Sequence, residues 1–337
     1  MSEKYQERLE NCFARAVQLF ERNLDFAPQS QIDLRADSGA DFAVKVAEDG
    51  NRFTLSISDG VVAEIDRIWD LLGETPILTT GEGFERLSFE GQKIEAPEKF
   101  ADLSVTWLLL HELMHVEMGH LDFSPEARLV EVSMTEGAHE RDIPAGLEKA
   151  DLPLIDKCFE MQADSEATDV FLGLYDNSRW TDLRVQAVCI FVVMALIERE
   201  NVRLGNFGAT HPRAGTRFFT LLGHLFQMWL YPNAVLDTSS GDTVVKTPEI
   251  PTEAEFKSYA HHVLTPLVGD AAYVAGFCDA HSFLKDIEGK GALFRDIFTA
   301  QYGEELIIES FETVAGKEWL ELRGINERMM IASGHRD

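Results

Sequence analysis

Apolar positions at the start of the chain change from a helical to an alternating period. Between Phe13 and Leu24 they recur every three or four residues with charges between them, which predicts a helix from about Glu3 to Asn23 or Leu24. Three later segments, QIDLRAD, FAVKVAED and RFTLSISD, place apolar residues at every second position, and EDGN separates the last two. This pattern predicts a small antiparallel sheet near the N-terminus, with a tight hairpin at EDGN.

Helical periodicity dominates the rest of the chain. GVVAEIDRIWDLLGE predicts a helix that stops at Gly73, and the connection after it, up to Phe100, is irregular and rich in Gly, Pro and charge. Four more helices are predicted, at about Ala101 to Leu121, Leu154 to Leu174, Asp182 to Asn201 and Thr216 to Tyr231. Residues 122–153 mix short apolar runs with charged ones, which predicts a mobile excursion over one side of the fold.

One segment near the C-terminal third is a candidate linker. PNAVLDTSSGDTVVKTPEIPTE, residues 232–253, holds three prolines and many small polar residues. Several short helices are predicted from Ala254 onward. We therefore expect residues 1–230 to form one domain and residues 231–337 to form a helical region packed on it. The predicted fold class is α+β and mainly α-helical.

The chain is strongly acidic, with 58 Asp and Glu against 30 Lys and Arg and a net charge of −28. Such a surface repels phosphate backbones and anionic lipid headgroups, so we expect no nucleic-acid partner. It is typical of a soluble, self-repelling protein. The alternative is an acidic cleft that attracts basic substrates.

Apolar runs and cysteines indicate the compartment. The longest apolar run, AVCIFVVMALI at residues 187–197, is well short of the about 20 residues that cross a bilayer. The N-terminal segment MSEKYQERLENCFARAVQLF carries charges where an export signal needs an apolar centre. The cysteines, at positions 12, 158, 189 and 278, form no CxxC pair. We expect a cytoplasmic protein with free buried thiols and without an integral membrane segment.

The segment TWLLLHELMHVEMGHLDF, residues 106–123, places histidines and glutamates in an apolar helix. Residues four apart lie about 40° apart around a helix, so His111 and His115 project from one face and can hold one cation. Glu112 lies on the flank of this face, where its carboxylate can reach a water on the metal. The alternative is a pair of histidines hydrogen-bonded within a core. The strongly apolar residues before His111 disfavour it, because buried polar groups need partners.

A catalytic zinc site needs a third protein ligand and an open position for water. His120 is the nearer candidate, but at five residues from His115 it lies about 140° around the helix, and we expect it at the helix end. The second candidate is the segment CFEMQADSEATD, where Glu160 and Asp164 lie one helical turn apart among apolar residues. Glu160 can then bind the metal while Asp164 accepts a hydrogen bond from a ligand histidine.

Three motifs, HELMHVEMGH, EMQAD and THPRAGTR in that order, resemble the gluzincin metallopeptidases of the M48 type, a group that includes the CAAX prenyl protease. They span about a third of the chain. The resemblance implies a zincin-like fold, with zinc bound by His111, His115 and Glu160. It also implies roles for four further residues: Glu112 as general base, Asp164 as the carboxylate behind a ligand, His211 as the group that steadies the tetrahedral intermediate, and Arg217 as a substrate-binding cation.

The chain departs from this family in one respect. Its members usually have transmembrane helices, and no segment of this sequence qualifies as one. Prenylated or membrane-embedded substrates are therefore not expected, and a soluble relative is the closer picture.

These features predict a zinc endopeptidase that hydrolyses peptide bonds in a protein or peptide substrate. Zinc lowers the pKa of bound water to about 7, Glu112 accepts the proton, and His211 stabilises the oxyanion. The alternative function is a non-catalytic regulator that binds a partner, with structural or absent zinc. Intact Glu112 disfavours it, because a structural site needs no base. Two histidines and a glutamate also suit other divalent metals.

Overall fold

The computed structural model describes residues 3–23, 32–49, 52–74, 97–122, 126–128, 147–148, 151–230, 235–237, 244–246 and 252–332. Most of the predicted irregular connection before Phe100 lies outside these ranges. So does most of the predicted excursion at residues 122–153.

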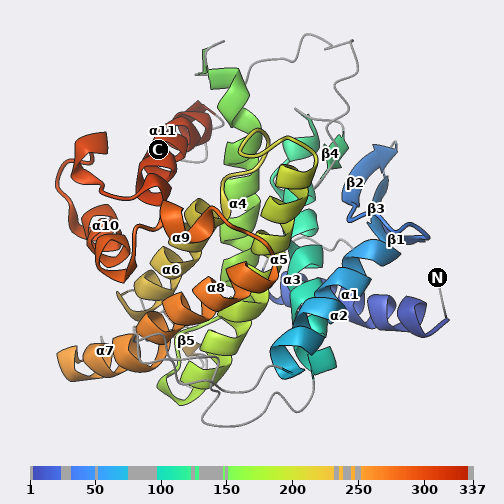
Figure 1. Cartoon of the computed structure of the whole chain (residues 1–337), viewed down its shortest axis with the longest axis horizontal. Helices are drawn as coiled ribbons and strands as arrows, with labels where there is room; N and C mark the ends of the chain where they lie inside the picture. Colours follow the sequence, from blue (N-terminus) through green and yellow to red (C-terminus); the bar gives the residue numbers. More distant parts are fainter. Residues whose placement is uncertain are drawn as a thin grey trace.

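Helices make up most of the described chain, which confirms the mainly helical class (Figure 1). The first six are α1 Glu3–Asn23, α2 Asp59–Glu74, α3 Pro97–Glu117, α4 Leu152–Leu172, α5 Trp180–Arg203 and α6 Ala214–Leu230. The others are α7 Glu253–Tyr259, α8 Thr265–Phe277, α9 Phe283–Asp286, α10 Lys290–Tyr302 and α11 Val314–Ala332. The described residues also include the short 3₁₀ helices η2 His120–Asp122, η4 Asn177–Arg179 and η6 Ile308–Ser310, and the π-helical segment η5 Ala260–Leu264.

A four-stranded sheet with the order β1-β3-β2-β4 lies beside the N-terminal helices (Figure 1). Its strands are β1 Ile32–Asp37, β2 Val44–Asp49, β3 Arg52–Ser58 and β4 Glu126–Arg128. β2 and β3 form the predicted antiparallel hairpin, in which Asp49 pairs with Arg52. β1 pairs parallel with β3, so the prediction of a purely antiparallel sheet is wrong. Alternation identifies a strand but not its neighbour, and β3, with its buried Leu55 and Ile57, takes the position between β1 and β2.

Helix α3 begins at Pro97 rather than at the predicted Ala101. Proline is favoured in the first turn of a helix, where its missing N–H would have no partner in any case. The helix ends at Glu117, and Gly119 adopts φ 68°, a left-handed conformation that suits glycine after a helix end. This turn places His120 outside α3, so the helical period does not set the direction of its side chain.

Helix α5 is the apolar centre of the fold. Every residue at positions 187–197 is at most 2% exposed, and α3, α4, α6 and α8 pack around the helix. By length and composition Asn177–Arg203 could cross a membrane, yet 67% of its apolar window is buried inside the fold. A buried core helix passes the same test, so one such helix is weak evidence for a membrane span.

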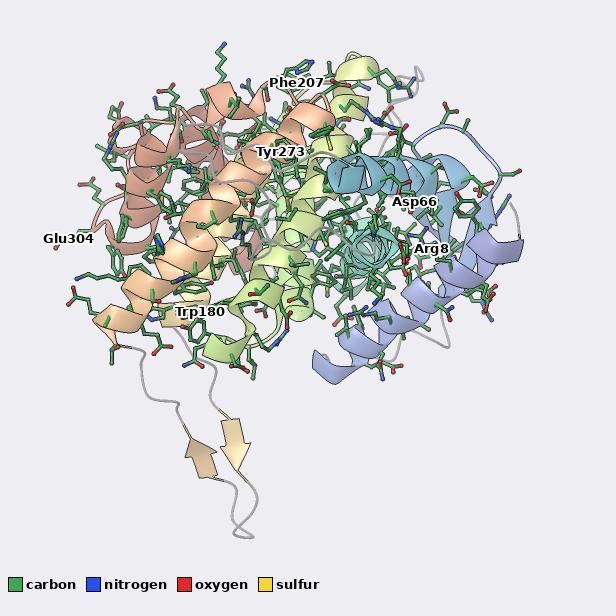
Figure 2. The ribbon with its side chains drawn as sticks, turned by 60° about the horizontal axis from the view of Figure 1, so that its bottom comes forward. Arg8, Asp66, Trp180, Phe207, Tyr273 and Glu304 are labelled. Carbon is green, nitrogen blue, oxygen red and sulfur yellow. The ribbon has the colours of Figure 1, made fainter. Side chains whose placement is uncertain are left out.

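The helices after residue 252 pack on the same body. α8 lies against α5, and α11 lies against both α4 and α6. Residues on both sides of position 231 contribute to one apolar core. The segment predicted as a linker contains a two-stranded antiparallel sheet, β5 Val235–Asp237 and β6 Val244–Lys246, which stands apart from the helices (Figure 2). The rest of residues 231–251 lies outside the described ranges.

Arg8 connects the first three helices. Its guanidinium donates to both carboxylate oxygens of Asp66 on α2 at 2.7 Å, and it also contacts Asp102 on α3 (Figure 2). Two carboxylates around one half-buried cation hold the first half of α3 against α1 and α2. The second half of α3 carries the HExxH residues.

All four cysteines lie in the described ranges, and they are buried and free, as predicted. Burial raises the pKa of the Cys12 thiol to about 11 and that of Cys158 to about 12. These thiols therefore stay protonated at neutral pH and behave as small apolar side chains.

Candidate metal centre

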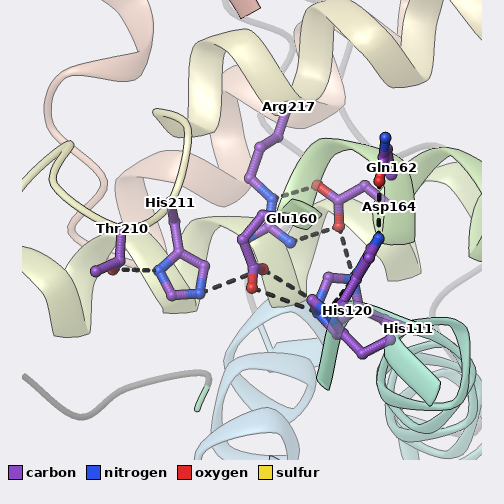
Figure 3. A network of polar contacts seen from close by, with 9 residues as sticks. His111, His120, Glu160, Gln162, Asp164, Thr210, His211 and Arg217 are labelled. Carbon is purple, nitrogen blue, oxygen red and sulfur yellow. Dashed lines mark hydrogen bonds and ion pairs between the residues drawn. The ribbon is translucent and has the colours of Figure 1, made fainter. Parts of the chain in front are cut away.

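Three segments far apart in the sequence bring polar side chains to one buried place (Figure 3). α3 supplies His111 and His115, α4 supplies Glu160, and the segment before α6 supplies His211. None of the four is more than 8% exposed. A buried polar atom without a partner costs about 1–3 kcal/mol, so such a cluster needs a compensating interaction.

The three residues predicted to bind a metal bring their nitrogen and oxygen atoms close together. His111 Nε2 lies 3.2 Å from His115 Nε2 and 3.2 Å from Glu160 Oε2, and His115 Nε2 lies 3.4 Å from Glu160 Oε1. Ligands at about 2.0–2.1 Å from a tetrahedral zinc ion are about 3.3 Å from one another, so the separations match. These residues are the group of histidine and carboxylate side chains that could hold a metal ion in the described part of the chain.

Unpaired oxygens also fit a bound metal. Among the described residues, Glu160 Oε2 and Glu112 Oε1 are buried and accept no hydrogen bond, although His111 Nε2 and His211 Nε2 lie 3.2 and 3.3 Å from Glu160 Oε2. A cation held by the three ligands would compensate Glu160 Oε2, and a water or substrate beside it could compensate Glu112 Oε1. The donor set and the unpaired atoms therefore agree.

Asp164 and Arg217 support His111 from behind (Figure 3). Asp164 Oδ1 lies 3.0 Å from His111 Nδ1. Arg217 donates from Nε and Nη2 to the two oxygens of Asp164, both at 2.6 Å. With its proton on Nδ1, His111 presents the Nε2 lone pair to a metal. Arg217, predicted to bind substrate, thus places two of its nitrogens on Asp164.

Charges in the cluster favour a cation. Burial opposes the charged form of Glu160, but His211, His115 and His111 hold its pKa well below the usual value. Burial acts likewise on Asp164, whose pKa is nevertheless lowered, chiefly by Arg217. Burial raises the pKa of Glu112 to about 7. Glu160 and Asp164 are therefore anionic at neutral pH, and Glu112 can either hold or release a proton there.

His211 lies on the side of Glu160 away from His111 (Figure 3). Its Nε2 is 3.3 Å from Glu160 Oε2, and its Nδ1 is 2.8 Å from Thr210 Oγ1. Burial lowers the pKa of His211 to about 4, so its imidazole is neutral at pH 7. A neutral imidazole still has one N–H to donate, which is what stabilisation of a developing oxyanion requires.

A further imidazole, that of His120, lies behind His115; the sequence predicted His120 at the helix end, but not this contact. His120 Nδ1 is 2.9 Å from His115 Nδ1, and His120 Nε2 is 2.7 Å from Gln162 Oε1 on α4. His120 thus contacts the ring nitrogen of His115 that is turned away from Glu160. Helical spacing could not place it, because the helix ends before it. The glycine at position 119 is the signal that could have shown this.

Residues 86–228 match the family model for Peptidase U49. The match supports a peptidase. It includes every residue named so far at the site and covers less than half of the chain, so the helices from α7 onward lie outside it. A search of curated proteins and a search of solved structures each found no match.

Metal binding is expected to release protons. Burial opposes a charge on His111, yet its contacts with Asp164 and Glu160 raise its pKa to about 10. The imidazole is therefore protonated at pH 8 in the metal-free protein, whereas a ligand needs the free lone pair. We expect release of at least about one proton per zinc, and an affinity that rises toward high pH.

Isothermal titration calorimetry at pH 8 in two buffers of different ionisation enthalpy gives the proton count. His224→Gln is the control, because His224 lies outside the cluster and contacts Asp169 at 3.5 Å. The count for this variant should equal that of the wild type. Binding without proton release would contradict the charge assigned to His111.

Proposed function

We propose that this protein is a zinc-dependent endopeptidase of the gluzincin type, with zinc bound by His111, His115 and Glu160. The observation that carries the proposal is the set of 3.2–3.4 Å separations between side-chain atoms of these three residues. The contact between Asp164 and His111 supports it, because ligand histidines usually donate their second N–H to a carboxylate or carbonyl. The match to a peptidase family supports the class of reaction.

The residues of the chain divide the chemistry among them. A bound zinc ion supplies a Lewis acid that lowers the pKa of water to about 7. Glu112, whose pKa is raised to about 7 by burial, can accept a proton near neutral pH and return it to the leaving amine. His211 can donate its N–H to the oxygen that becomes negative as the peptide carbonyl is attacked.

Protein or peptide is the proposed substrate. In the described part of α3 and α4, the buried side-chain oxygens that accept no hydrogen bond are Glu112 Oε1 and Glu160 Oε2, and neither recognises a particular side chain. Specificity therefore has to come from residues outside the ligand set.

Metal removal tests the proposal. The purified protein is expected to contain about one zinc per chain. Dialysis against 1,10-phenanthroline should abolish cleavage of a proteome-derived peptide library, and added zinc, but not magnesium, should restore it. Inductively coupled plasma mass spectrometry measures the metal content of the same samples.

The outcomes separate the candidate functions. Full cleavage by a metal-free sample would overturn the proposal. Stoichiometric zinc without cleavage of any library peptide would instead favour the non-catalytic regulator.

A further inference from the structure

We propose that His120, Gln162 and Asn326 are positioning residues that fix the tautomer of His115, and that helix α11 is thereby part of the metal centre. The inference rests on the proposed role of His115 as a metal ligand. The three residues come from η2, α4 and α11, and Asn326 lies far outside the range that matches the peptidase family.

An unbroken line of polar contacts joins α11 to the ligand. His115 Nδ1 lies 2.9 Å from His120 Nδ1, and His120 Nε2 lies 2.7 Å from Gln162 Oε1. Gln162 Nε2 donates in turn to Asn326 Oδ1. His115 and His120 are each 3% exposed and Gln162 is 9% exposed, so water has little access to compete for these bonds.

When His115 binds a metal, the hydrogen bonds along this line can be donated in only one direction. Ligation through Nε2 leaves the proton of His115 on Nδ1, so His120 Nδ1 has to accept. A neutral His120 then carries its own proton on Nε2 and donates it to Gln162 Oε1. The bond from the amide nitrogen of Gln162 to Asn326 orients the amide so that its oxygen faces His120. Each donor and acceptor is therefore matched from α11 to the metal ligand.

Packing holds the far end of this line in place. Leu322, Ile325 and Met329 of α11 form an apolar cluster with Ile155 and Phe159 of α4. The ring of Phe159 also stacks on His120, with ring centres 4.4 Å apart. The position of α11 thus fixes both the polar partner and the apolar wall of His120.

Both nitrogens of His120 are used within the line, which distinguishes a positioning residue from a fourth ligand. Its Nδ1 faces His115 Nδ1, the nitrogen opposite the one that lies near Glu160. An Nε2–H on His115 would block ligation. If the acceptor at His120 or the acceptor at Gln162 is lost, the line no longer disfavours the His115 tautomer with its proton on Nε2.

Paired substitutions at Gln162 test the proposal. Gln162→Leu removes the acceptor for His120, and we expect zinc affinity to fall by about 10–100-fold. Gln162→Glu retains an acceptor oxygen and should keep affinity within about threefold of the wild type. Asn326→Ala, at the far end of the line, should have a smaller effect than Gln162→Leu. Glu166→Gln, at an exposed position of the same helix, is the control.

Competition with a chromophoric chelator measures zinc affinity, and long-range ¹H–¹⁵N spectra of the imidazoles report the tautomers. In the metal-free wild type, His120 should carry its proton on Nε2, and in Gln162→Leu the two tautomers should mix. A purely structural role would not change the tautomer of a folded variant. Wild-type His120 protonated on Nδ1, or unchanged affinity in Gln162→Leu, would overturn the inference.

The same data separate this inference from the proposed function. If the wild type bound zinc but cleaved no peptide, the proposed activity would be wrong. The tautomers and zinc affinities would still test the role of the contacts from His115 to Asn326. If Gln162→Leu did not fold, the affinity and His120 tautomer of Asn326→Ala would decide the outcome.

Discussion

Glu112→Gln is expected to lower kcat for peptide cleavage by about 10²–10⁴-fold, the usual contribution of general acid–base catalysis, while zinc stays bound. The amide has nearly the shape of the carboxylate but cannot accept a proton from water. Burial raises the pKa of Glu112 to about 7, so the wild-type carboxylate is matched to proton transfer near neutral pH. Glu112 is not one of the three clustered ligands, so metal content should not change.

Cleavage rates on the peptide library and zinc content on the same preparation measure this effect. Glu117→Gln is the matched control, because Glu117 is an exposed residue of the same helix, and it should retain wild-type activity. Full activity in Glu112→Gln would refute the proposed mechanism. Loss of zinc from this variant would show that Glu112 acts as a ligand.

Glu160→Gln is expected to weaken zinc binding by more than about 100-fold, the upper limit found for residues that only orient ligands. The change removes the one anionic ligand and leaves two neutral imidazoles on α3 to hold the ion. It also removes a partner of His111 whose contact, at 3.2 Å, helps to raise the pKa of that imidazole to about 10. Cleavage should fall in parallel with zinc content.

Zinc affinity by chelator competition, measured beside thermal unfolding of the metal-free variant, tests this prediction. Glu166→Gln on α4 is again the control, because it makes the same charge change at an exposed position of that helix. Unchanged affinity in Glu160→Gln would mean that another residue supplies the third ligand. Zinc should raise the melting temperature of the wild type and of the control, but much less that of Glu160→Gln.

The helix α3 and its two histidines follow from local pattern alone. The apolar residues before His111 predict a buried helix. The four-residue spacing places both imidazoles on the same face of this helix, wherever the helix packs. Gly73 likewise marks the place where a helix was predicted to stop, and α2 ends at Glu74. Such features depend on residues within one or two turns, so one sequence is enough to show them.

Contacts between residues far apart in the chain are harder to predict from the sequence. β1 lies parallel to β3 because the chain places β3 between β1 and β2 in the sheet. The alternation of apolar residues predicts strands but not which strands pair. Glu318 of α11 accepts from the backbone N–H of Arg213 at 3.2 Å and from Thr216 Oγ1 at 2.5 Å. It thereby holds the beginning of α6, next to His211, from a helix about a hundred residues away.

The sequence by itself determined the helical class, the HExxH face and the free buried thiols, because each depends on residue type and near spacing. Only the tertiary structure decided that Glu160 meets the two histidines and that Arg217 turns to Asp164. The same holds for the line from His120 to Asn326. These contacts join separate helices, and the packing of whole apolar faces, rather than any local period, brings those helices together.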